Sequence, residues 1–262
     1  MTDPTVTETG ADLQRENRIL ERRLRRMEAN VHQLEEFQDS NSKLLSQLVL
    51  DLEQERARSR RLLLNVLPER IVQRLEAGEQ RIADRHESVT VLFSDFVDFT
   101  EIAAELEPRV LIDELNELFS GFDAVCDRTG VETIKTIGDA YLVVGGMTGS
   151  GDATAAVADT ALGMCAFVAG RKGGRADWRV RIGIHTGSLV AGVVGTSRFA
   201  YDIWGDTVNM ASRLETTSKP GRIQVSADVA RRLESGYVLE SRGLVELKGK
   251  GKAETCFLNA RR

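Results

Sequence analysis

Two aspartates, Asp95 and Asp139, occupy positions where carboxylates often gather around a metal ion. Asp95 ends an apolar stretch in FSDFVDFT, and Asp139 lies in the predicted turn of IKTIGDAY. Carboxylates at strand ends and in tight turns can converge on Mg²⁺, which prefers oxygen ligands and takes few of them from the protein. Two such groups, sharing substrate phosphates, suit a two-metal site. Spacing alone leaves a conformational role open, because Asp is common in turns.

Alternating strand and helix patterns from residue 88 onward are expected to position these aspartates. Residues 88–96 are rich in β-branched and aromatic side chains and predict a strand. Residues 131–137 and 140–146 predict a hairpin around Gly138-Asp139. Further helices are predicted at 99–107, 108–129, 153–169 and 206–217, and further strands at 178–186, 189–194, 237–247 and 254–259, with Gly192 and Gly195 permitting a tight hairpin. This order predicts an α+β fold, a mostly antiparallel sheet covered by helices.

The N-terminal region carries a heptad repeat over residues 13–52. Its core positions are Leu13, Asn17, Leu20, Leu24, Met27, Val31, Leu34, Gln38, Asn41, Leu45, Leu48 and Leu52. A mostly apolar seam with a period of about 3.5 residues, uninterrupted by Gly or Pro, predicts a parallel coiled coil. Buried Asn17 and Asn41 would weaken the coiled coil but set its register. A long surface helix on a globular core is the alternative.

Bulk composition argues against several classes of protein. The net charge of −5 and the pI of about 5.5 disfavour a nucleic-acid binder. No apolar stretch approaches the roughly 18 residues that cross a bilayer, and no signal peptide is visible. The cysteines Cys126, Cys165 and Cys256 form no CxxC pair, which favours a reducing compartment without structural zinc. We therefore expect a cytoplasmic protein, or the soluble part of a longer membrane-anchored or sensor-linked one.

Five motifs, in matching order and spacing, resemble the catalytic domain of class III adenylate and guanylate cyclases. They are FSDFVDFT, ETIKTIGDAYLVVGG, VRIGIHTGSLVAGVVG, YDIWGDTVNMASRLE and ELKGKGKAETCFL. The resemblance covers about residues 86–259 and implies a ferredoxin-like, palm-type antiparallel sheet sandwich with flanking helices. Together with the heptad repeat, it divides the chain into a disordered N-terminus at 1–12, a coiled-coil signalling helix at 13–60, a transducer element at 61–85 and a cyclase catalytic domain at 86–262.

The resemblance also implies roles for single residues. For the metal site, Asp95 and Asp139 match the two metal-binding aspartates, and the backbone carbonyl of Phe96 matches a further metal contact; two Mg²⁺ ions per site are implied, with Mn²⁺ as a substitute. The substrate and catalytic matches are Lys135 and Asp202 on the purine, Arg181 and Lys248 on the phosphates, Asn209 on the ribose, and Arg213 on the pentavalent phosphorus. The acceptor of the 3′-hydroxyl proton stays open between a metal-bound carboxylate, a phosphate oxygen and water.

The residue types at the purine position favour ATP. Asp202 can accept from the 6-amino group of adenine and Lys135 can donate to N1, whereas guanine reverses both polarities. The resemblance further implies a homodimer with two shared sites, each built from both subunits, and an upstream sensor as a possible input. A guanylate cyclase is the first alternative. An inactive cyclase-like dimerisation module is the second, although such modules usually lack residues that this chain retains.

Overall fold

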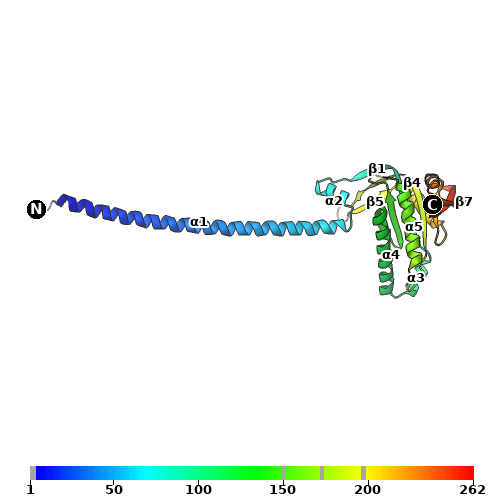
Figure 1. The fold of residues 1–262 in the computed structure, drawn as a ribbon, viewed down its shortest axis with the longest axis horizontal. Helices are drawn as coiled ribbons and strands as arrows, with labels where there is room; N and C mark the ends of the chain where they lie inside the picture. Colours follow the sequence, from blue (N-terminus) through cyan, green and yellow to red (C-terminus); the bar gives the residue numbers. More distant parts are fainter. Residues whose placement is uncertain (1–3, 149–150, 172–173, 196–198) are drawn as a thin grey trace. The chain divides into compact units, whose positions relative to one another are not determined.

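The computed structural model describes residues 4–148, 151–171, 174–195 and 199–262, and it divides into two units, Met1–Pro68 and Glu69–Arg262. The first unit consists of one helix, α1 (Pro4–Leu64), drawn in Figure 1. The helix therefore includes residues 4–12, which we expected to be disordered; Pro4 is compatible with the first helical turn, where its missing N–H costs no hydrogen bond. Residues 1–3 lie outside the described part of the chain.

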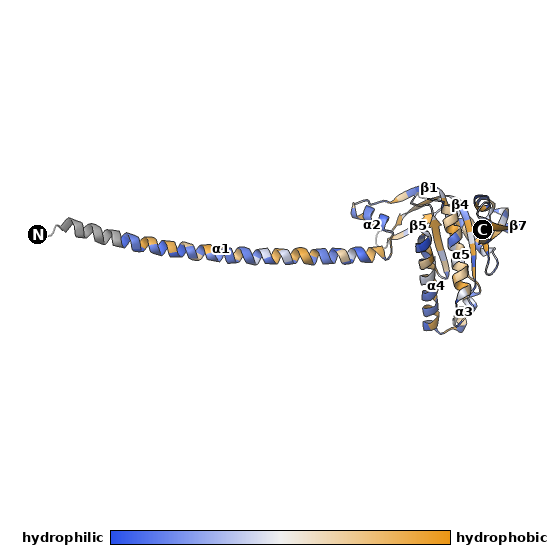
Figure 2. Cartoon of the chain, in the orientation of Figure 1, coloured by the Kyte–Doolittle hydropathy of each residue, from blue (hydrophilic) through white to orange (hydrophobic). Residues whose placement is uncertain are grey.

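The predicted coiled-coil seam of α1 is exposed along its length. The exposed fraction is 53% at Leu20, 64% at Met27, 62% at Leu45 and 70% at Leu52. Figure 2 shows hydrophobic segments recurring between hydrophilic ones along α1. A long helix is thus confirmed. Its partner helix stays a prediction, but a repeated apolar stripe of this kind is typical of an interaction surface.

The second unit is an α+β domain, as predicted. Its elements are α2 (Glu69–Glu76), β1 (Ala83–Phe96), α3 (Phe99–Glu105), α4 (Pro108–Thr129), β2 (Glu132–Ile137), β3 (Ala140–Gly145), α5 (Ala153–Gly170), β4 (Val180–Val194), β5 (Ala200–Trp204), α6 (Asp206–Thr216), β6 (Ile223–Ser226), α7 (Ala227–Leu233), β7 (Tyr237–Leu247) and β8 (Gly251–Arg261). The sheet has the order β2-β3-β1-β4-β6-β8-β7, and β5 pairs with β4 outside this path. The described strand pairs are antiparallel except β4 with β6.

Helices cover both faces of this sheet. Helices α4 and α5 pack against each other, and α5 lies on β1 and β3 (Figure 1). Ile182 and Ile184 of β4 belong to the same buried core as α4 and α5. Gly183, between them, points to the opposite face, where a Cβ would lie 2.3 Å from the Ala211 carbonyl oxygen of α6. Helix α6 therefore lies on the other face, and the missing side chain permits its close approach.

Helix α5 has the length and composition of a membrane span, the one helix among the described residues to do so. In the fold, however, Val157, Ala161 and Met164 are fully buried in the domain core. A core helix passes the same test, so this finding is weak support for a membrane segment.

The strand predicted in two pieces, 178–186 and 189–194, is one continuous strand, β4. It pairs with β1 from Phe96↔Val180 to Ala83↔Gly192, with an irregularity between His86 and Val89. Gly192 serves close packing here, because a Cβ would lie 2.4 Å from the Ile82 carbonyl oxygen. The turn glycine is Gly195, with φ 95°. The short elements β5, β6 and α7 were not predicted from the sequence.

Candidate active site

The two predicted metal ligands lie close together, where β1 ends beside the turn between β2 and β3. Asp95 lies near the end of β1, and Asp139 lies in the turn between β2 and β3. Because Ser94 pairs with Tyr141, the turn is brought beside Asp95. Burial, and then hydrogen bonding and charge repulsion from Asp95, raise the pKa of Asp139 to about 6.

This carboxyl pair fits a divalent cation. Two neighbouring acidic groups repel each other when ionised, and a cation between them removes that cost. The described residues contain no cluster of three or more His, Cys, Asp or Glu side chains, so further ligands would come from backbone, water or substrate. Phe96, the predicted backbone ligand, anchors the strand end, since its ring packs 5.3 Å from the Trp178 ring and 5.9 Å from the Phe122 ring.

Arg181 connects the aspartate pair to helix α6. It faces Asp95 across the β1–β4 pairing, and its Nη2 lies 2.7 Å from an Asp95 carboxylate oxygen. Its Nε lies 2.5 Å from the Glu215 carboxylate, which is largely buried. Burial raises the pKa of Glu215, and Arg181 opposes that shift. Glu215 was not predicted from the sequence, although its spacing of four from the buried Ala211 marks it as inward-facing.

Lys135 and Asp202 are brought together from distant parts of the sequence. Lys135 lies on β2 and Asp202 on β5, and the Lys135 Nζ lies 2.5 Å from an Asp202 carboxylate oxygen. The other Asp202 oxygen accepts a hydrogen bond of 2.8 Å from the Ile203 backbone N–H. Both side chains keep solvent access, with exposed fractions of 37% and 20%. A donor and an acceptor therefore stand side by side and within reach of a ligand.

The remaining predicted residues flank α6. Asn209 and Arg213 lie one turn apart on this helix, so they share a face. Lys248 is exposed in the turn between β7 and β8. An ion pair between Lys250 in that turn and Asp206, at the start of α6, holds the turn near the helix. Within the described residues, the predicted site residues therefore form separate small groups. One link between them is formed by the ion pairs of Arg181, which join Asp95 to Glu215 of α6.

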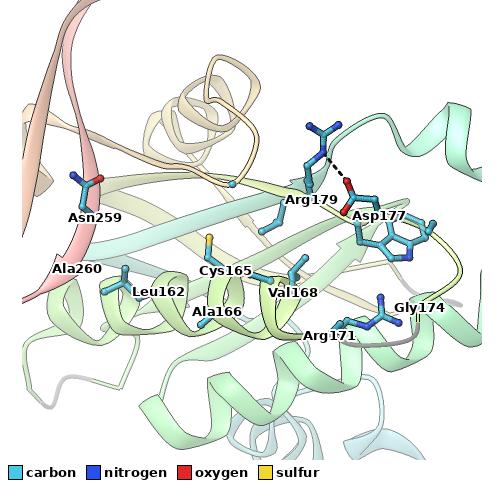
Figure 3. A pocket seen from close by; sticks show the side chains of 15 residues that line it. Leu162, Cys165, Ala166, Val168, Arg171, Gly174, Asp177, Arg179, Asn259 and Ala260 are labelled. Carbon is cyan, nitrogen blue, oxygen red and sulfur yellow. Dashed lines mark ion pairs between the residues drawn. The ribbon is translucent and has the colours of Figure 1, made fainter.

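A cavity of about 850 Å³ lies elsewhere, along α5. Figure 3 shows Leu162, Cys165, Arg171 and Arg179 among its lining residues, with Arg179 ion-paired to Asp177. None of the predicted site residues lines it. This cavity is therefore separate from the predicted site residues.

Residues 82–260 match the family described as the adenylate and guanylate cyclase catalytic domain. The chain is a member of the class III nucleotidyl cyclases. An adenylate cyclase of Mycobacterium tuberculosis is 45% identical over 214 residues, which are 80% of this chain and 48% of that protein. Human retinal guanylyl cyclase 1 is 38% identical over 244 residues, 90% of this chain and 22% of that protein.

The cyclase fold is also shared with a solved structure. The guanylate cyclase domain of RhGC from Catenaria anguillulae, crystallised in complex with GTP, superposes with a TM-score of 0.66 at 37% identity, covering 68% of this chain and all of that one. The predicted cyclase domain and fold class are therefore confirmed. This cyclase chain spans about half the length of its mycobacterial relative. Relatives of both nucleotide preferences match, so membership alone does not assign the purine.

Proposed function

We propose that this cyclase converts ATP to 3′,5′-cyclic AMP and pyrophosphate, at two sites shared between the subunits of a homodimer. The observation that carries the choice of ATP is the Lys135–Asp202 pair. An adenine edge would accept from Lys135 at N1 and donate its 6-amino hydrogens to Asp202. A guanine edge would place an N1–H against the ammonium and a carbonyl oxygen against the carboxylate, and each buried mismatch costs about 1–3 kcal/mol.

In this reaction the 3′-oxygen bonds to the α-phosphorus, and the bond from that phosphorus to the α,β-bridging oxygen breaks, so that this oxygen leaves with the pyrophosphate. The hydroxyl proton passes to a metal-bound carboxylate, a phosphate oxygen or water. Asn209 would hold the ribose, so that the attacking oxygen lies in line with the leaving group. Arg213 would meet the charge that grows on the pentavalent phosphorus. Arg181 and Lys248 would bind the phosphates.

Asp95 and Asp139, with the Phe96 carbonyl, would hold Mg²⁺. When bound, Mg²⁺ supplies a lower pKa for the 3′-hydroxyl and neutralises phosphate charge. The divalent-metal dependence of class III cyclases agrees with a close carboxyl pair, whose mutual repulsion such an ion relieves. The number of ions and the preference for Mg²⁺ over Mn²⁺ are part of this proposal.

The dimer is supported by two features of the chain. The apolar stripe of α1 is exposed, and pairing with a second α1 in a parallel coiled coil would bury it. The predicted site residues form partial sets, and a symmetric partner could complete each of them twice. We place this dimer in the cytoplasm, where Cys126, Cys165 and Cys256 would stay unpaired, and we expect α1 to carry the signal of an upstream sensor.

A guanylate cyclase is the second candidate, favoured by the 38% identity to the retinal enzyme. The test is nucleotide preference. Wild-type protein should form cyclic AMP from ATP with a kcat/KM about tenfold or more above that for GTP, and the double variant Lys135→Glu with Asp202→Cys should shift the ratio toward GTP, because it reverses the hydrogen-bond polarity at the purine edge. Initial rates with each nucleotide, with Mg²⁺ and with Mn²⁺, measure both.

Two outcomes would contradict this assignment. Preferential turnover of GTP by the wild type would make the chain a guanylate cyclase. An unchanged ATP preference in the double variant would remove Lys135 and Asp202 from the purine pocket.

The coiled coil is tested by removing residues 1–60. Without the α1 stripe, dimerisation should weaken, and specific activity should become dependent on protein concentration, recovering at high concentration, because the coiled coil raises the effective concentration of one catalytic domain near the other. Sedimentation and activity over a dilution series measure this. Leu45→Gln with Leu48→Gln should act in the same direction, whereas Gln47→Ala, outside the seam, should not. Constant specific activity of the truncated protein would argue against this role for α1.

A further inference from the structure

Helix α2 is fastened to the catalytic domain by two arginines that lie one turn apart. Arg70 donates from Nη2 to the Glu132 carboxylate of β2 at 2.9 Å and to the Tyr201 hydroxyl of β5, and its guanidinium lies 5.6 Å from the centre of the Tyr201 ring. Arg74 instead pairs with Glu79 at 2.7 Å and with Asp84 of β1. The two arginines thus hold the same helix to different parts of the domain.

The contacts of Arg70 lie beside the purine-reading pair. Glu132 is on the same strand as Lys135, and Tyr201 directly precedes Asp202. In the described sheet, β2 pairs with β3 while β5 pairs with β4, so no backbone ladder joins β2 to β5. Side chains hold the two strands together. They are the Lys135–Asp202 ion pair and the Arg70 guanidinium, which contacts both Glu132 and Tyr201.

Binding of a purine would break one of these two links between β2 and β5, the Lys135–Asp202 ion pair, and leave the Arg70 contacts in place. Under the proposed function, on which this step rests, Lys135 and Asp202 turn from each other to the base. Their own ion pair then no longer sets the spacing of β2 and β5. Arg70 keeps its contacts, because neither Glu132 nor Tyr201 is a predicted ligand of the nucleotide.

The contacts of Arg70 with Glu132 and Tyr201 are largely buried and do not form a solvated surface pair. The exposed fraction of the side chain is 28% for Arg70 and 20% for Glu132, and Tyr201 is buried. Charge-assisted hydrogen bonds at such sites are stronger than neutral ones and hold a fixed geometry. The Arg70 Nε is buried without a hydrogen-bond partner in the described part of the chain, so the guanidinium is held in place by its Nη2 and its ring contact.

We propose that Arg70 is a positioning residue for nucleotide selection: by joining Glu132 to Tyr201, it sets the separation of Lys135 and Asp202 at the purine edge. The assignment places a determinant of purine affinity on α2, outside the matched family region of residues 82–260. It concerns binding and discrimination, and the phosphoryl chemistry at Asp95 and Arg213 is expected to stay intact.

The experiment compares Arg70→Met with Arg74→Met in the full chain. Arg70→Met should raise KM for ATP about tenfold and lower the ATP-to-GTP ratio of kcat/KM by a similar factor, with kcat within about twofold of wild type. Arg74→Met loses the other attachment of the same helix, and it should leave KM and the ratio within about twofold.

Tyr201→Phe, which removes one hydroxyl and keeps the ring, should shift KM for ATP in the same direction as Arg70→Met, but by less. Arg70→Met combined with Glu132→Gln should be no worse than Arg70→Met alone, because both changes break one contact.

Several results would overturn the assignment. Equal effects of Arg70→Met and Arg74→Met would make α2 a general support. A lower kcat with unchanged KM and unchanged ratio would separate Arg70 from the purine edge. If Arg70→Met fails to fold, an unchanged KM and ratio in Tyr201→Phe would reject the proposal. A wild type that prefers GTP would overturn the proposed function alone, and the KM for GTP would then test Arg70 in the same way.

Discussion

Replacing Asp95 or Asp139 with alanine should abolish turnover while leaving the dimer intact. Each change would remove one of the two carboxylates proposed to bind the metal ions, so both activation of the hydroxyl and neutralisation of the phosphates would be lost. We expect less than about a tenth of the wild-type kcat, which corresponds to a barrier at least about 1.4 kcal/mol higher. Product formation at saturating ATP and Mg²⁺, with sedimentation to check the dimer, measures the effect.

The controls for this prediction separate metal binding from folding. Asp113→Ala changes an exposed aspartate of α4 and should leave activity unchanged. Asp139→Asn preserves the shape of the turn and should still be nearly inactive, with any residual rate requiring more Mg²⁺. Asp95 also pairs with Arg181, so the thermal stability of Asp95→Ala must be compared with that of Asp95→Asn. Retention of more than about a tenth of the wild-type rate by either alanine variant would refute the two-metal assignment.

A mixture of two inactive variants should recover activity. In the proposed dimer, Asp95→Ala would disable the metal half of both sites, and Arg213→Ala would disable the half that stabilises the transition state. In a mixed dimer both lesions fall in one site, because Asp95 of one chain would face Arg213 of the other. The second site is then intact. With equal amounts and random exchange, half of the dimers are mixed and each keeps one of two sites, so roughly a quarter of the wild-type activity should return.

This complementation depends on exchange of subunits. The α1 coiled coil would slow exchange, so the two variants should be co-expressed with different affinity tags and purified through both. Tandem purification isolates mixed dimers, which should then carry about half of the wild-type specific activity. Mixed dimers as inactive as the single variants would place Asp95 and Arg213 in the same chain's site.

Features that depend on nearby residues followed from the sequence. The hairpin around Gly138-Asp139 was predicted within a residue, because a turn chemistry and two apolar flanks specify it locally. The placement of Asn209 and Arg213 on one face of a helix was also predictable, because residues four apart in a helix share a face. Resemblance to the cyclases, in turn, supplied the proposed roles of these residues, because chemistry at a cyclase site requires particular side chains.

Features that depend on distant neighbours needed the fold. The length of β4 is set by its pairing with β1, since no single stretch of sequence encodes a partner's register. Glu215 reaches Arg181, and Arg70 reaches Glu132 and Tyr201, across separations of 34, 62 and 131 residues. These contacts leave no local pattern, because an acidic or basic residue on a helix looks solvated until packing brings a partner of opposite charge beside it. The sequence could therefore name candidates for the reacting groups, whereas the side chains that contact them became visible only once distant strands and helices were packed together.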